Sequence, residues 1–132
     1  MKFLLTIYGD ESGWGDATPE DVGQIMAAYE AFGRAAADAG VLVGGEGLQP
    51  TSTATTVRVR DNEMLTTDGP FAETREQLGG YYLLDCGDLD EAIGWAARIP
   101  GAATGSVEVR PVMDYEGAGS EHPDEARQGA QS

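Results

Sequence analysis

A single α+β domain is predicted by three observations on this sequence. At 132 residues the chain is long enough for one hydrophobic core but not for two. Short alternating segments indicate strands, and two segments with apolar residues at three- and four-residue spacing indicate helices. Their order is strand, helix, strand, hairpin, strand, helix, strand. This order predicts a ferredoxin-like split βαβ arrangement with an inserted β-hairpin and an antiparallel sheet.

The first strand and the first helix have well-marked boundaries. Residues 2–8 alternate around Phe3, Leu5 and Ile7, which predicts a strand with one buried face. Thr18 followed by Pro19 matches an N-cap and a proline at the first helical position, and a glycine at residue 40 matches the end. We expect one apolar stripe of this helix to face the sheet: Val22, Ile25, Met26, Tyr29, Phe32 and Ala36.

The middle of the chain predicts a second strand and a hairpin. Residues 41–49 begin as a strand and continue into glycines around Glu46, which indicates a bulge or a close approach to the backbone. Residues 54–60 and 63–67 have strand character on either side of Asp61-Asn62, a turn-forming pair. We therefore expect these two segments to pair as a hairpin.

The last third predicts a helix and a closing strand. Asp88 is the expected N-cap of the second helix, and Glu91 completes a capping-box-like pair. Its expected apolar stripe is Leu89, Ala92, Ile93 and Ala96. Residues 106–112 alternate with Val107 and Val109 inward. Residues 1–113 therefore form the predicted domain, and residues 114–132, which lack an apolar period, are expected to be a disordered acidic tail.

The most distinctive segment is residues 68–85, which we call the signature stretch. It reads Asp-Gly-Pro-Phe-Ala-Glu-Thr-Arg-Glu-Gln-Leu-Gly-Gly and continues into Tyr-Tyr-Leu-Leu-Asp. Gly69 and Pro70 predict a sharp bend, and Gly79 and Gly80 permit close backbone approach before a buried strand. The stretch resembles the signature of the YCII-related family, in the branch known as DGPF after its residues. The resemblance extends from residue 1 to about residue 114.

The resemblance implies a dimeric α+β barrel and hence a homodimer. It does not imply a reaction, because most members of the family have none assigned. Related proteins are thought to use a histidine on the first helix and an aspartate beyond the second strand as an acid/base pair. Asp68 matches the aspartate, whereas Tyr29 stands near the histidine position. Whether this chain is an enzyme is therefore uncertain. Tyr29 and Asp68 are the candidate catalytic pair, either for acid/base chemistry or for holding a polar ligand.

A cavity near the signature stretch is expected to bind a small polar metabolite. The candidate ligand-binding residues are Tyr8, Glu46, Arg58, Phe71, Glu73, Tyr81, Tyr82 and Arg110. We expect the sheet face away from the helices to hold Leu4, Thr6, Tyr8, Arg58, Arg60, Tyr82 or its neighbour, Glu108 and Arg110. This face is too apolar for water and too charged for a dry core, which is consistent with a dimer interface.

Each candidate also has a structural interpretation. Asp68 is equally well explained as a turn residue whose carboxylate bonds nearby backbone N–H groups. Tyr29 and Phe71 are more often packing residues, and Glu73 more often caps a short turn. A buried Glu46 needs a partner, which one of three arginines can supply: Arg58, Arg60 and Arg110. The same three arginines are equally well explained as an anion-binding cluster.

Composition limits the partners. Eight basic against 23 acidic residues give a net charge of −15, which disfavours direct binding to nucleic acid or to an anionic membrane. The N-terminal apolar run is too short for a membrane span or a secretory signal. The single cysteine, Cys86, is expected to be half-buried and structural, in a reducing compartment. These features predict a cytoplasmic protein.

No cofactor or metal site is predicted. The only histidine, His122, lies in the expected tail, and the glycines around Glu46 lack the GxGxxG order of a nucleotide loop. An alternative function is regulatory, because proteins that resemble this one are often encoded beside extracytoplasmic-function sigma factors. The chain would then be a non-catalytic partner of a sigma factor, through its acidic surface or its tail.

Overall fold

The computed structural model describes residues 1–115, which form six strands and two α-helices. The strands are β1 (Lys2–Gly9), β2 (Leu42–Gly47), β3 (Thr55–Arg60), β4 (Glu63–Asp68), β5 (Gln77–Asp85) and β6 (Ser106–Pro111), and the helices are α1 (Pro19–Asp38) and α2 (Leu89–Ala96). Three short 3-10 helices, η1 (Glu11–Asp16), η2 (Thr51–Thr53) and η3 (Pro100–Ala102), lie in the connections. The predicted order of elements is confirmed. Of the expected tail, residues 114–132, the part from residue 116 onward lies outside the described residues.

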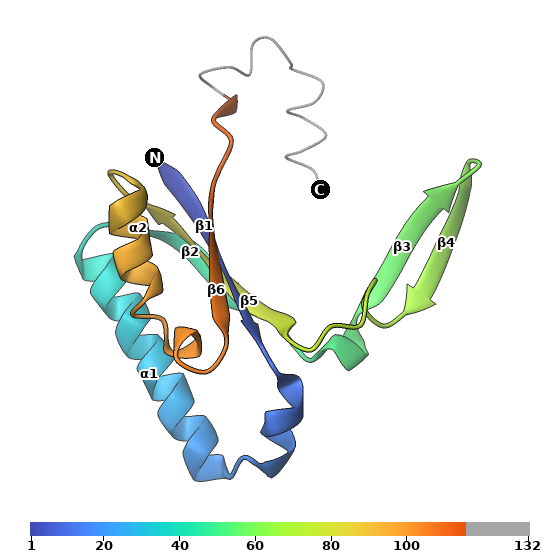
Figure 1. The fold of residues 1–132 in the computed structure, drawn as a ribbon, viewed down its shortest axis with the longest axis horizontal. Coiled ribbons are helices and arrows are strands. Elements are labelled where there is room, and N and C mark those ends of the chain that lie inside the picture. The colour runs from blue at the N-terminus through green and yellow to red at the C-terminus, as the bar shows by residue number, and fades with distance from the viewer. Residues whose placement is uncertain (116–132) are drawn as a thin grey trace.

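Four strands form one antiparallel sheet in the order β2-β5-β1-β6. Because β5 lies between β1 and β2 and is antiparallel to both, β1, α1 and β2 form the predicted split βαβ unit. Both helices lie on the same side of this sheet (Figure 1). The ferredoxin-like α+β fold is therefore confirmed.

The core lies between this sheet and the two helices. Phe3, Leu5 and Leu84 project from the central strands and are at most 1% exposed. Phe32 of α1 packs on the Tyr82 ring with centroids 4.8 Å apart. Cys86 belongs to this core and is 2% exposed, so it is fully buried rather than half-buried. Burial also raises the pKa of its thiol, as is typical of a structural cysteine in a core.

The expected N-caps of both helices, Thr18 and Asp88, are confirmed. The Thr18 hydroxyl accepts a hydrogen bond from the Asp21 N–H, and the Asp21 carboxylate accepts one from the Thr18 N–H. At the second helix the Asp88 carboxylate accepts from the Glu91 N–H, as predicted. The Glu91 carboxylate accepts from the N–H of Gly87 rather than that of Asp88, so the box closes one residue earlier.

The predicted apolar stripes are only half buried. In α1, Phe32 and Ala36 are buried, but Val22 is 37% and Met26 62% exposed. The first turns of α1 run past the end of the sheet, so the sheet does not cover Val22 and Met26 (Figure 1). In α2 the small residues face the core, whereas Leu89 and Ile93 are 48% and 49% exposed.

The predicted close approaches between strands are confirmed at two glycines. A Cβ atom at Gly45 would lie 2.6 Å from the Tyr82 ring and 2.7 Å from the Tyr81 carbonyl oxygen. A Cβ atom at Gly80 would lie 2.9 Å from the Glu46 carbonyl oxygen. The predicted bulge is present too, as a register shift in β2 against β5 between residues 42 and 44. Side chains at these positions would force the two strands apart.

The predicted hairpin forms a separate two-stranded sheet. Asp61 and Asn62 both have positive φ, 53° and 62°, as a tight hairpin turn requires. The hairpin stands away from the main sheet and from both helices (Figure 1). The expectation that Arg58 and Arg60 lie on the face of the main sheet away from the helices is therefore wrong, because β3 does not pair with that sheet.

Candidate functional site

The sheet face away from the helices is only partly exposed. We call it the open face; its central part is formed by Leu4, Thr6 and Tyr8 of β1 beside Tyr81 and Leu83 of β5, all of intermediate exposure. The register pairs Leu4 with Leu83 and Thr6 with Tyr81. Tyr82 projects to the helix side, so its neighbour Tyr81 is the β5 tyrosine on this face. The open face is therefore mixed, with apolar, aromatic and hydroxyl groups side by side.

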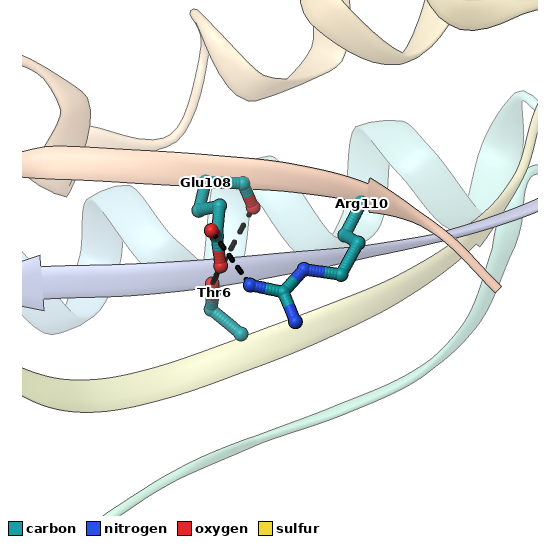
Figure 2. A network of polar contacts seen from close by, with 3 residues as sticks. All are labelled: Thr6, Glu108 and Arg110. Carbon is teal, nitrogen blue, oxygen red and sulfur yellow. Dashed lines mark hydrogen bonds and ion pairs between the residues drawn. The ribbon is translucent and has the colours of Figure 1, made fainter.

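One edge of the open face carries a polar network (Figure 2). The Arg110 guanidinium donates to the Glu108 carboxylate at 2.8 Å, and the Thr6 hydroxyl donates to the same carboxylate at 3.3 Å. The hydrogen bond from Arg110 holds the pKa of Glu108 below its usual range, and Glu108 in turn raises the pKa of Arg110. The positive charge of Arg110 is thus neutralised by Glu108, a residue of the same strand.

Residues 69–76, which we call the signature loop, connect the hairpin to β5. Gly69 has a φ of +102°, in the region that favours glycine, so the predicted sharp bend is confirmed. Its N–H donates to the Ala54 carbonyl at 2.7 Å, and its carbonyl accepts from the Thr56 hydroxyl at 2.8 Å. The base of the hairpin therefore fixes where the loop begins.

The far end of the signature loop is fixed to two other connections. The Gln77 side chain accepts a hydrogen bond from the Glu11 N–H at 2.9 Å and donates one to the Thr74 carbonyl. The Glu11 carboxylate accepts from the N–H and the hydroxyl of Thr51, at 3.0 and 2.7 Å. The Ser106 hydroxyl donates a hydrogen bond to the carboxylate of Glu76, in the loop, at 2.9 Å. Connections distant in sequence are therefore joined into one frame.

This frame surrounds an open pocket of about 330 Å³. Its lining comes from η2, the signature loop and the first residue of β5: Thr51, Ser52, Gly69, Pro70, Ala72, Glu73, Thr74 and Gln77. Thr51, Thr74 and Gln77 use their polar side-chain groups within the frame. Within residues 1–115, the Ser52 hydroxyl and the Glu73 carboxylate form no hydrogen bond or ion pair. These two groups remain available to a ligand that donates hydrogen bonds.

The residues predicted to line one cavity lie in three places. Tyr8 and Tyr81 lie on the open face, whereas Tyr29 and Tyr82 lie between the sheet and α1. Asp68 and Phe71 belong to the hairpin and the signature loop, where Phe71 is 79% exposed. Of the predicted site residues, Glu73 lines the pocket.

A single chain does not bring Tyr29 and Asp68 together. Tyr29 packs against the core near Gly101, and Asp68 ends β4 of the projecting hairpin. Burial raises the pKa of Tyr29, an effect only partly offset by the backbone of Gly101. The phenol therefore stays protonated at neutral pH and suits packing better than proton abstraction.

The predicted arginine cluster is not assembled within the chain either. Arg58 lies on the hairpin, Arg110 lies on β6, and Glu46 lies on β2 at the opposite edge of the sheet. Glu46 is exposed rather than buried, because β2 is an edge strand. Within residues 1–115, Glu46 forms no ion pair. The expected need of Glu46 for a partner therefore does not arise.

The described residues contain no group of three or more histidine, cysteine, aspartate or glutamate side chains that could hold a metal ion. His122 lies outside this part of the chain. No helix in residues 1–115 is both long and apolar enough to cross a bilayer.

Comparison with known proteins agrees with the resemblance in the signature stretch. The model of the YCII-related domain matches residues 1–116. The chain belongs to the YCII-related family. A curated relative in this comparison is an uncharacterized protein of Rhizobium meliloti (strain 1021), 41% identical over 117 residues, which cover 87% of this chain and 94% of that protein. Membership in this family leaves the reaction open.

The sequence did not predict Glu11, Thr51, Ser52 and Gln77 as parts of this site. Glu11, Thr51 and Ser52 lie in the connections η1 and η2. Polar turns and acidic loop residues are common in proteins, so these residue types do not indicate a binding site. Their role arises from the hydrogen bonds that join η1, η2 and the signature loop.

Proposed function

We propose that this YCII-related protein binds a small polar metabolite in the signature-loop pocket. The observation that carries the proposal is the pairing of a fixed frame with two uncommitted polar groups, Ser52 and Glu73. The volume of about 330 Å³ is at the lower end of the range for small-molecule sites. A carboxylate beside a hydroxyl favours a ligand with hydroxyl or ammonium donors.

The test is a thermal-shift panel of small polyols, amino acids and amines, with isothermal titration calorimetry of any molecule that stabilises the wild type. Selective binding to the folded state raises the melting temperature. Glu73→Gln is expected to weaken the binding of such a ligand by about tenfold or more, because a charge-assisted hydrogen bond is lost.

The matched control is Glu63→Gln, which removes an exposed carboxylate at the other end of the hairpin. This variant is expected to bind the ligand as the wild type does. The proposal fails if no member of the panel stabilises the wild type, or if Glu73→Gln and wild type bind the ligand equally.

We propose further that the protein is a cytoplasmic homodimer associated through the open face. Leu4, Tyr81 and Leu83 leave apolar surface on this face that nothing in residues 1–115 covers fully. Contiguous apolar surface of this kind marks an association site. Sedimentation velocity of the wild type tests the dimer, and Leu83→Asp is expected to weaken it.

A regulatory role beside an extracytoplasmic-function sigma factor is the second candidate. It is favoured by α2, where the exposed Leu89 and Ile93 lie one turn apart among Asp88, Asp90 and Glu91. An apolar ridge with acidic flanks fits a basic amphipathic segment.

Co-purification with the sigma factor encoded beside this protein tests this role. Loss of the complex on Ile93→Asp supports docking at α2, whereas loss only on truncation at Asp114 assigns it to the tail. Absence of a complex with the wild type contradicts the role.

A further inference from the structure

The signature-loop pocket carries a negative charge. Glu73 is the only charged residue among those that line it. A second carboxylate, that of Glu11, accepts a hydrogen bond of 2.7 Å from the hydroxyl of Thr51, so it lies next to the lining. Arg75, the basic residue of the signature loop, does not line the pocket. Within residues 1–115, no ion pair neutralises the charge of Glu73.

The hydroxyl groups of two lining threonines can only accept a further hydrogen bond. Thr51 donates its hydroxyl hydrogen to the Glu11 carboxylate, and Thr74 donates its own to the Glu76 carbonyl at 2.6 Å. Each hydroxyl has one hydrogen, so only lone pairs remain for a ligand. The ionised Glu73 carboxylate is an acceptor too. These three side chains therefore complement a ligand that donates hydrogen bonds.

A positively charged nitrogen matches both the charge and the acceptors. An ammonium group has three N–H donors and no acceptor. Its hydrogen bond to a carboxylate is charge-assisted, and such bonds are about twice as strong as those between neutral groups. A carboxylate or phosphate group in the pocket would instead lie near a charge of its own sign on Glu73, which costs free energy. The pocket therefore favours a cation over a neutral polyol, and a neutral polyol over an anion.

Other lining residues suit a short carbon chain. The side chains of Pro70 and Ala72 are apolar and border the same pocket as Glu73. The volume of about 330 Å³ admits a small molecule of a few carbon atoms. The net charge of −15 also raises the concentration of cations near the surface of this protein.

We propose that the signature-loop pocket takes a small primary amine without an acidic group, with its ammonium group on Glu73 and its carbon chain against Pro70 and Ala72. This inference rests on the proposed function and names the class of ligand for that pocket. It discriminates against amino acids and phosphorylated molecules, because their acidic groups meet the Glu73 carboxylate. Ser52 supplies a hydroxyl for a second polar group of the amine.

The test is isothermal titration calorimetry of the full chain at pH 7 with three probes that differ in one group. The probes are 4-amino-1-butanol, 1,4-butanediol and 4-hydroxybutanoate, each with four carbon atoms and a hydroxyl group. The amine is protonated at this pH, because alkyl ammonium groups such as that of lysine have a pKa of about 10.4. It is expected to bind at least about tenfold more tightly than the diol, and the anion is expected to bind most weakly.

Two variants that remove one negative charge each separate the pocket from the general charge of the protein. In Glu73→Gln, the dissociation constants of the amine and the diol are expected to come within about threefold of each other. Glu63→Gln, at the other end of the hairpin, is expected to keep the preference of the wild type. Both carboxylates are exposed, so both variants are expected to fold, which thermal melting checks.

The outcomes distinguish the ligand class from the pocket. A wild type that binds the diol or the anion as tightly as the amine overturns the amine, as does a preference lost equally in both variants. No binding of the amine at millimolar concentration also overturns it. In each case the pocket itself stands if another member of the thermal-shift panel binds the wild type and is weakened by Glu73→Gln, and it falls if no member does.

Discussion

The sheet–helix body and the region formed by the hairpin and the signature loop are held by different forces. In the body, Phe3, Leu5 and Leu84 are at most 1% exposed. In the hairpin, every residue of β4 is exposed. The signature loop between them is fixed by hydrogen bonds such as those of Gly69 to Ala54 and to Thr56.

This difference separates stability from recognition. A well-packed core carries most of the free energy of folding, whereas loops and exposed elements on such a scaffold carry binding. The family signature falls on the boundary, with its first half in the loop and its second half in the central strand β5, where Gly80 and Leu84 are buried. The same stretch therefore contributes to folding at one end and to the candidate pocket at the other.

The largest contrast is expected between Leu84→Ala and Leu65→Ala. Leu84 is fully buried, so its truncation is expected to lower the free energy of unfolding by about 2–5 kcal/mol. Leu65 is 44% exposed on the hairpin, and its truncation is expected to cost less than about 1 kcal/mol. Urea denaturation at one protein concentration measures both. Equal losses would contradict the division into two regions.

The next contrast compares two neighbouring glycines of β2. Gly45→Ala places a Cβ atom 2.6 Å from the Tyr82 ring and 2.7 Å from a backbone oxygen, so we expect a loss of about 1–3 kcal/mol. Gly44 has no atom within 4 Å of such a Cβ. Gly44→Ala is therefore expected to be neutral or to stabilise by up to about 1 kcal/mol. Thermal melting of both variants measures the two effects. An unchanged melting temperature for Gly45→Ala would show that β2 can shift away from β5 to accommodate the Cβ atom.

A smaller and local effect is expected from Glu11→Gln. The amide keeps the shape of the side chain but weakens the two hydrogen bonds from Thr51, at a cost of about 1–2 kcal/mol. Amides of residues 51–53 are expected to exchange about tenfold faster, while those of β5 stay protected. Equal acceleration in both segments would show that the loop frame and the body open together.

The smallest effect is expected from Glu108→Gln, on the open face. The pKa of Glu108 is lowered from 4.5, chiefly by Arg110, so its contribution to stability is present above pH 4.5 and is lost as the pH falls through the lowered value. The difference in melting temperature between wild type and variant is therefore expected to be small at neutral pH and to vanish in acid. A difference that grows in acid would contradict this sign.

The sequence by itself determined the body of the fold. Alternation around Phe3 and Leu5, the Thr18-Pro19 helix start and the glycines of β5 each specify local geometry, because strand period, capping and steric freedom depend on near neighbours. The signature stretch indicated the family, because its characteristic residues follow one another in one continuous segment.

Only the tertiary structure decided which side chains share a site. It separated Tyr29 from Asp68, placed Tyr81 rather than Tyr82 on the open face and left Arg58 outside the main sheet. It also joined Glu11 to Thr51, forty residues away along the chain. Such contacts depend on how the connections pack at the end of the sheet, which periodicity and turn chemistry do not encode.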